Sequence, residues 1–191
     1  MRPGLWVCTM LLPVAHLTSA GDANAEEATL WEQVSRGGYV LLVRSAATPL
    51  ARSGAPYTRG GCVQERDIGK VGQALALHLG QVFREHGVPV SRVLASPACP
   101  SIETAQIAFG IPETWNTADS DGNASGDRRA WRARNASSLA SWTTTTGNLV
   151  VVTDKLVISE LTNRNVAAGE VLVLKPSGDQ LDVAGQLSLS P

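Results

Sequence analysis

The sequence predicts an α/β fold in three layers, with a mostly parallel sheet covered by helices on both faces. Two apolar runs, at residues 39–43 and 149–153, are typical of central strands buried on both sides. Around them, segments with helical periodicity alternate with short strand-like segments, which is the pattern of an open α/β sheet. Because the carboxyl ends of the strands in such a sheet meet at a common crevice, we expect a site there.

The other elements follow from apolar periodicity and from stop signals. A long helix is predicted at residues 64–87. Its apolar residues recur at three- and four-residue spacing and are expected on one buried face: Ile68, Val71, Leu75, Leu79, Val82 and Phe83. The remaining predicted elements are strands at 91–95, 171–175 and 181–189, the last at an edge, and helices at 101–109, 128–142 and 157–162.

The composition is that of one ordinary globular domain. The chain has 191 residues, of which 43% are hydrophobic and 17% charged, and its formal net charge is -1. This length is enough to bury a single core without a metal or a disulfide. The balanced charge provides no field that would favour nucleic acid or a membrane surface, so we expect no nucleic-acid partner.

Residues 1–25 predict a signal peptide, which leaves residues 26–191 as the mature domain. The start is positively charged, residues 5–17 are mostly apolar, and small residues offer cleavage after Ala20 or Ala25. No later segment approaches the roughly 20 apolar residues of a membrane span. We therefore expect a periplasmic or secreted protein with no integral membrane segment in the mature chain; an uncleaved anchor is the alternative.

Two cysteines, Cys62 and Cys99, remain after that cleavage. An even pair in a chain bound for an oxidising compartment favours a disulfide, and two buried free thiols are the alternative. No histidine cluster accompanies them in the sequence, so we expect neither a zinc site nor any other metal or cofactor.

Four arginines lie within residues 128–134 of the predicted helix 128–142. Such a cluster indicates either a solvated helix face or an anion-binding patch, and the solvated face is the commoner case. The inward-facing residues of this helix are expected to be Trp131, Leu139 and Trp142.

Five segments together resemble the histidine phosphatase superfamily, and in particular its exported short-chain branch. In chain order, over residues 37–178, they are VLLVRSAAT, CVQERDIGKVGQALAL, VSRVLASPACPSIETAQIAFG, NLVVVTDKLVISELT and AAGEVLVLKPSG. The most specific part is the serine-proline turn that opens an E-T-A helix. The resemblance implies the fold of that superfamily and, in its active members, a histidine that attacks phosphorus while cations neutralise the charge on the oxygens.

Position by position, the resemblance implies a degenerate phosphate pocket. Arg44 matches the first arginine, and Ser45 stands at the position of the nucleophilic histidine. Pro100 replaces the second arginine and Asp154 the second histidine. Arg66 matches a further arginine of the branch, so Arg44 and Arg66 are the expected ligand-binding residues. The pair Cys62 and Cys99 also matches a cysteine pair of that branch.

These replacements remove both the nucleophile and part of the positive charge. A serine hydroxyl needs a base, and a carboxylate such as Asp154, with a reference pKa near 4, is a weak one. A carboxylate a few ångströms from a phosphate also costs roughly 1 to 4 kcal/mol of binding energy. We expect Arg44 to form an ion pair with Asp154, and His78 and His86 to be surface or capping residues.

Three functions remain open on the sequence. The first is an inactive pseudoenzyme that binds a small anionic ligand or a protein partner. The second is an active phosphomonoesterase with rewired chemistry around Arg44, Ser45 and Asp154, alone or with a divalent ion held by Asp154, Glu65 and Glu103. The third is a structural protein of the cell envelope in which the pocket has no role.

Overall fold

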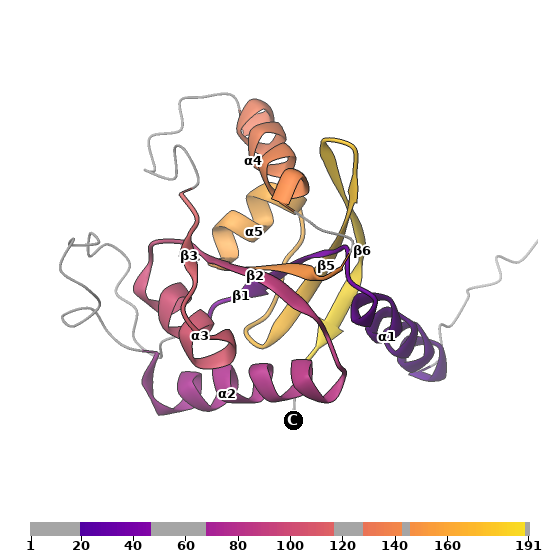
Figure 1. Ribbon diagram of the computed structural model, residues 1–191, viewed down its shortest axis with the longest axis vertical. Helices are drawn as coiled ribbons and strands as arrows, with labels where there is room; N and C mark the ends of the chain where they lie inside the picture. Colours follow the sequence, from indigo (N-terminus) through magenta and orange to yellow (C-terminus); the bar gives the residue numbers. More distant parts are fainter. Residues whose placement is uncertain (1–19, 47–67, 117–127, 143–145, 190–191) are drawn as a thin grey trace, which may run out of the picture.

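The computed structural model describes residues 20–46, 68–116, 128–142 and 146–189. In these ranges six strands and five helices alternate (Figure 1). In chain order they are α1 (Ala20–Ser35), β1 (Val40–Arg44), α2 (Gly69–Glu85), β2 (Val90–Ala95), α3 (Cys99–Phe109), β3 (Glu113–Thr114), α4 (Arg128–Trp142), β4 (Asn148–Thr153), α5 (Lys155–Thr162), β5 (Glu170–Ser177) and β6 (Gln180–Ser188).

All six strands form one sheet, in the order β3-β2-β4-β1-β5-β6. The first four strands of that order run parallel, while β5 is antiparallel to β1, and β6 is antiparallel to β5. The predicted mostly parallel sheet is therefore confirmed. The central strand β4 is buried along its whole length, as its continuous branched sequence predicts.

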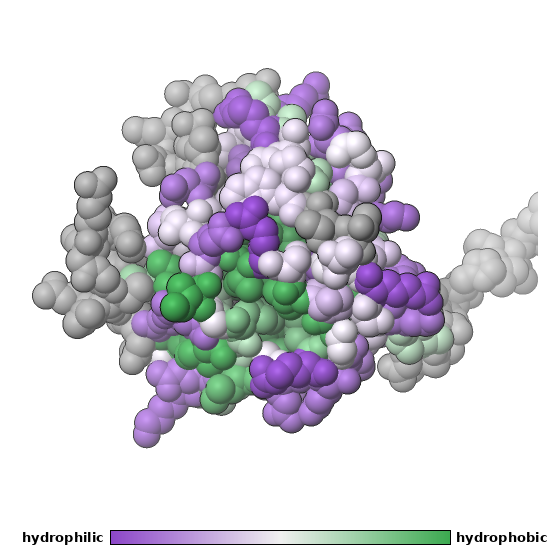
Figure 2. Space-filling model, in the orientation of Figure 1, coloured by the Kyte–Doolittle hydropathy of each residue, from purple (hydrophilic) through white to green (hydrophobic). Residues whose placement is uncertain are grey.

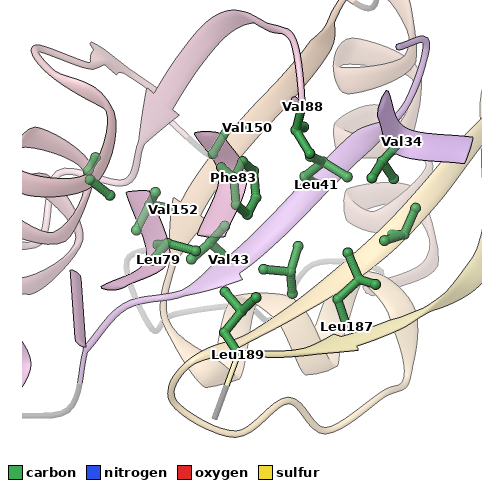
Figure 3. Packing of buried hydrophobic residues seen from close by; sticks show 14 of the residues in the cluster. Val34, Leu41, Val43, Leu79, Phe83, Val88, Val150, Val152, Leu187 and Leu189 are labelled. Carbon is green, nitrogen blue, oxygen red and sulfur yellow. The ribbon is translucent and has the colours of Figure 1, made fainter. Parts of the chain in front are cut away.

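Helices cover both faces of the sheet, which gives the three predicted layers (Figure 1). Alternate residues of β1 point to opposite faces: Leu41 and Val43 pack in the cluster with α1, α2 and α3, and Val40 and Leu42 pack in the cluster with α4 and α5. Figure 3 shows the first cluster, in which Phe83 and Leu79 of α2 lie against the side chains of the sheet.

The buried face of α2 differs from the predicted one. Leu79 and Phe83 are buried as expected, but Val71 is 75% exposed. In its place, small residues form the contact face: Gly72, Ala76 and Gly80. A Cβ atom at Gly80 would lie 2.3 Å from the carbonyl oxygen of Ala108 in α3, so the two helices approach more closely than a larger side chain would allow. Counting large apolar side chains overlooks a face of this kind.

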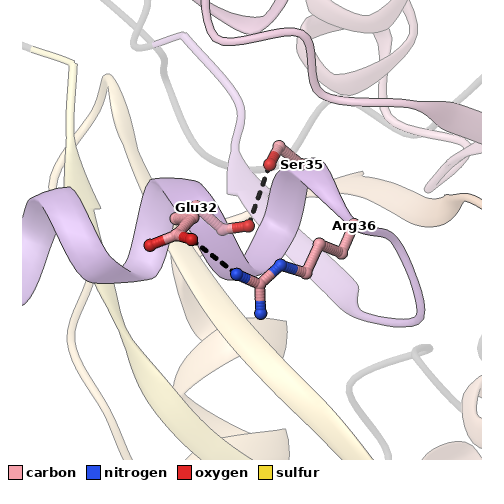
Figure 4. Close-up of polar contacts among 3 residues, drawn as sticks. All are labelled: Glu32, Ser35 and Arg36. Carbon is pink, nitrogen blue, oxygen red and sulfur yellow. Dashed lines mark hydrogen bonds and ion pairs between the residues drawn. The ribbon is translucent and has the colours of Figure 1, made fainter.

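The helix α1 was not predicted, and it runs across the predicted boundary after Ala25. Its buried residues Leu30, Trp31 and Val34 all follow that boundary. At its exposed end, Arg36 pairs with Glu32, and the hydroxyl of Ser35 donates to the backbone carbonyl of Glu32 (Figure 4). The packed part of α1 therefore belongs to the expected mature domain.

None of the helices in the described ranges combines the length and the apolar character that a membrane crossing requires.

Candidate functional site

Three parallel strands end side by side at one edge of the sheet. Arg44 of β1 is the register partner of Thr153 of β4, and the N–H of Ser45 donates to the carbonyl of Thr153 at 2.8 Å. On the other side of β4, the N–H of Ser96, just after β2, donates to the carbonyl of Val152 at 3.0 Å. The structure thus brings together Arg44, Ser45, Thr153 and Ser96, as the topology predicts.

The first two turns of α3 lie against these strand ends. The hydroxyl of Thr104 accepts from the N–H of Ala46 at 3.1 Å and donates to the carbonyl of Pro100 at 2.6 Å. The hydroxyl of Ser96 donates to that of Ser101 at 2.9 Å. Pro100 therefore lies on the segment that contacts the chain just after Ser45, at the place where the resemblance expects an arginine, and it carries neither a charge nor an N–H donor.

Most of the buried polar side chains of the described residues gather at these strand ends and at the start of α3. Those in this group are Ser45, Ser96, Ser101, Thr104 and Thr153; Asn135 and Asn148 lie elsewhere. Sequence reasoning assigned a role only to Ser45 in that group. The signal that sequence reasoning missed is that hydroxyl residues directly follow β2, end β4, and lie in the first two turns of α3.

Within this group, the hydroxyl of Thr153 is exceptional. Its side chain is fully buried, yet Oγ1 has no hydrogen-bond partner in the described part of the chain. A buried hydroxyl without a partner costs about 1 to 3 kcal/mol relative to a paired one. Thr153 adjoins Arg44 in register, so an unpaired donor and a cation lie on neighbouring strands.

The expected ion pair between Arg44 and Asp154 is not present, and that prediction was wrong. Nη1 of Arg44, which is half-buried, donates to the backbone carbonyl of Val166 at 3.0 Å. Oδ1 of Asp154 instead accepts from the N–H groups of Leu156 at 2.7 Å and Val157 at 3.0 Å. Asp154 is the N-cap of α5, where a carboxylate satisfies N–H groups that have no partner inside the helix.

No base lies against the hydroxyl of Ser45 among the described residues. The N–H of His86 caps the end of α2 by donating to the carbonyl of Val82, and its ring stacks on that of Trp31 with the centroids 4.0 Å apart. His86 is therefore a capping residue, as predicted. Asp154, the other candidate base, directs its carboxylate to the first turn of α5.

The described residues also contain no group of three or more potential metal ligands from histidine, cysteine and acidic side chains. Oε2 of Glu103 accepts from the N–H of Ile68 at 2.9 Å, which ties α3 to the start of α2. Glu65, Arg66 and Cys62 lie outside the described residues, so the predictions made for them are not tested. Cys99 is the first residue of α3 and is 2% exposed.

Solved structures with a similar chain path support the fold that the sequence indicates. The protein histidine phosphatase SixA, complexed with tungstate, matches with a TM-score of 0.56 at 12% identity, over 79% of this chain and 97% of that one. The product of the open reading frame Rv3214 from Mycobacterium tuberculosis matches with a TM-score of 0.57 at 16% identity, over 81% and 100%. The chain has the histidine phosphatase fold.

A further match to the histidine phosphatase fold is the phosphoserine phosphatase from Entamoeba histolytica, in complex with 3-phosphoglyceric acid. Its TM-score is 0.52 at 14% identity, over 78% of this chain and 96% of that one. No family model and no curated protein sequence matches the chain. Its likeness to the histidine phosphatases therefore lies in the fold, and the chemistry of the site has to be argued from this chain's own residues.

Proposed function

We propose that this protein is an exported, catalytically inactive relative of the histidine phosphatases that binds a small anionic ligand where β1, β2 and β4 end. The observation that carries the proposal is the state of Ser45. It occupies the position at which the resemblance expects the nucleophilic histidine, and no described base contacts its hydroxyl. Without a base, a serine hydroxyl remains protonated at neutral pH and is a poor nucleophile.

The second support for inactivity is the position of Asp154. In a rewired phosphatase this carboxylate would have to take the proton of Ser45. Its Oδ1 instead accepts from two N–H groups in the first turn of α5, so this carboxylate serves as the N-cap of that helix. The alternative function, a phosphomonoesterase built on Arg44, Ser45 and Asp154, therefore has less support.

An anion is the ligand class that the remaining groups favour. Arg44 supplies a half-buried guanidinium with further N–H donors beyond the one used on Val166. The adjacent hydroxyl of Thr153 is buried without a partner. SixA was solved with tungstate, an oxyanion. Because Pro100 provides no second cation, we expect weak binding, with a Kd on the order of 1 mM.

The direct test is hydrolysis of p-nitrophenyl phosphate by the purified mature protein, with and without Mg²⁺. We expect no turnover above that of the matched variants Ser45→Ala and Asp154→Asn. Turnover that Ser45→Ala abolishes would overturn the proposal in favour of the rewired phosphatase. Calorimetry with inorganic phosphate then measures binding, and Arg44→Gln is expected to abolish it.

A gain-of-function variant tests whether the mapped positions are the right ones. The triple variant Ser45→His, Pro100→Arg and Asp154→His restores the residues that the resemblance expects, and it should bind phosphate at least tenfold more tightly than the natural chain, since a charge-assisted contact is worth about 1.5 to 3 kcal/mol. The Asp154 change also removes the N-cap of α5, at a cost of about 1 kcal/mol in stability. Its folding is therefore checked first by circular dichroism.

The export and the disulfide of Cys62 with Cys99 belong to the same proposal. They are supported by the apolar amino-terminal segment and by the even cysteine pair that remains after cleavage. Thiol titration of the unfolded, unreduced mature protein should find no reactive thiol. Two reactive thiols in that assay would refute the disulfide.

A further inference from the structure

A groove of about 820 Å³ lies on the face of the sheet opposite α2 and α3. It separates α4 from the end of α5 and from the turn between β5 and β6. We call it the arginine groove, and its lining residues on α4 include Arg129, Arg132 and Arg134, while those opposite include Leu161, Asp179 and Leu181. None of these residues belongs to the candidate site at the strand ends.

One face of α4 forms a wall of the arginine groove. Five of the lining residues of α4, Arg129, Arg132, Ala133, Ala136 and Ser137, follow the spacing of a single helix face, and Arg134 and Ser138 lie beside that face. The core-facing side of α4 adjoins this wall: it holds the buried residues Asn135 and Leu139, and Ala136 packs against the core from the shared edge, while Arg129, Arg132 and Ala133 are exposed. The wall is therefore presented to whatever occupies the groove, and its nine-residue length corresponds to about 12 Å.

Most of the charged side chains that line the arginine groove are arginines. Among the described residues that line it, three are arginines and one, Asp179, is acidic, and α4 contains no aspartate or glutamate. Nε of Arg132 donates to the carbonyl of Glu160 near the end of α5 at 2.8 Å. That bond holds the guanidinium at the rim, where a cation also interacts favourably with the carboxyl end of the helix. The floor is apolar, through Leu161 and Leu181.

We propose that the arginine groove binds an acidic segment of a partner protein that also carries an apolar side chain. Carboxylates match the guanidinium groups in geometry and charge, and the apolar side chain covers Leu181 and Leu161. The groove accommodates about four residues of extended chain, at roughly 3.3 Å per residue. Nucleic acid is disfavoured because the described residues that line the groove include no aromatic side chain for base stacking.

The test uses fluorescence anisotropy with a labelled hexapeptide of sequence Glu-Leu-Asp-Leu-Glu-Asp and the full mature protein. One control probe replaces each acid by its amide, and a second replaces each leucine by serine. The triple variant R129Q/R132Q/R134Q is compared with Arg84→Gln, which changes an exposed arginine of α2 outside the groove. Circular dichroism confirms that each variant is folded, and the single variant Arg132→Gln serves if the triple one is not.

We expect the triple variant to lose about tenfold or more in affinity, Arg132→Gln to lose about threefold, and Arg84→Gln to be unchanged, because each exposed charge pair contributes roughly 0.2 to 1 kcal/mol. Both control probes should bind more weakly than the acidic one, and added salt should weaken binding further. The proposal is overturned if the acidic probe does not bind at millimolar protein, or if the amide probe binds equally well. Binding to vesicles of anionic phospholipid, without binding of the probe, would overturn it in favour of a membrane.

Discussion

The buried polar side chains at the two ends of β4 differ in whether they are hydrogen-bonded. At the amino end, Asn148 is fully buried, and its amide donates to the carbonyls of Val34 at 2.7 Å and Pro89 at 2.9 Å while accepting from the N–H of Tyr39 at 3.1 Å. At the carboxyl end, the equally buried Thr153 has an unpaired hydroxyl. The amino end is satisfied by its own chain, whereas the carboxyl end retains hydrogen-bonding capacity.

The amino end of β4 therefore has a structural role, whereas its carboxyl end belongs to the candidate site. A satisfied network of buried polar groups joins the end of α1, the start of β1 and the loop before β2, and so specifies how they assemble. An unpaired buried hydroxyl carries a cost that folding alone does not explain. Its position beside Arg44 supports the proposal that this end of the strand binds an anion.

The largest expected effect on stability comes from removing the hydrogen-bonded side chain of Asn148 at the amino end of β4. Asn148→Ala removes three hydrogen bonds of the side chain, and the N–H of Tyr39 loses the oxygen to which it donates, so we expect about 3 kcal/mol or more of lost stability. Urea unfolding measures the loss. The matched control is Asn135→Ala, which removes one bond inside α4 and should cost about 1 kcal/mol. Equal losses in the two variants would contradict the view that Asn148 joins separate elements.

A smaller effect is expected just beyond the other end of β4, at the N-cap of α5. Asp154→Ala should destabilise the protein by about 1 kcal/mol, whereas Asp154→Asn should stay within a few tenths, because asparagine caps as well as aspartate does. Thermal unfolding of both variants distinguishes the two roles. If Asp154→Asn costs as much as Asp154→Ala, the negative charge itself matters and an interaction beyond capping is involved.

Removing the unpaired hydroxyl of Thr153 should change the stability of the protein in the opposite direction. Thr153→Val keeps the shape of the side chain and removes Oγ1, so stability should stay equal or rise by up to about 1 kcal/mol. Urea unfolding in the absence of phosphate measures it, with Thr153→Ser as the variant that keeps the hydroxyl. A loss above about 1 kcal/mol in the valine variant would mean that the hydroxyl has a partner in solution, and the contrast between the two ends of β4 would then fail.

The smallest effect belongs to the exposed edge of the sheet, away from both ends of β4. Arg92 of β2 forms a hydrogen-bonded ion pair with Glu113 of β3 and lies 4.1 Å over the ring of Trp142. The hydrogen bond and charge of Arg92 lower the pKa of Glu113 below its usual 4.5. The pair therefore stabilises the protein above pH 4.5, and this contribution is lost as pH falls through the lowered pKa.

Melting curves of the natural chain and of Glu113→Gln test the pH dependence of the Arg92–Glu113 pair. The natural chain should melt slightly higher at pH 7, and the difference should vanish in acid, where Glu113 is protonated in both the folded and unfolded states. A difference that persists in acid would assign the effect to packing around Trp142 in place of charge.

Much of the fold was predictable because its signals are local. The apolar runs of β1 and β4 and the periodicity of α4 and α5 identify these elements with bounds close to those observed. The helix α1 was missed because its start overlaps the predicted signal peptide and only Leu30, Trp31 and Val34 of the rest are buried apolar residues; β3 was missed because two residues carry no periodicity. The degenerate pocket was named from the sequence, through residues that stand at the positions of a known pattern, and it stays a prediction.

The sequence by itself determined the α/β class, the order of its elements and the identity of the groups at Arg44, Ser45, Pro100 and Asp154. Only the tertiary structure decided what those groups contact. Arg44 reaches a carbonyl 122 positions away in the chain, and Asp154 turns to its own helix. Residue spacing does not encode such choices, because hydrogen bonds to nearby backbone groups compete with long-range ion pairs and their outcome depends on where the packed elements place each atom.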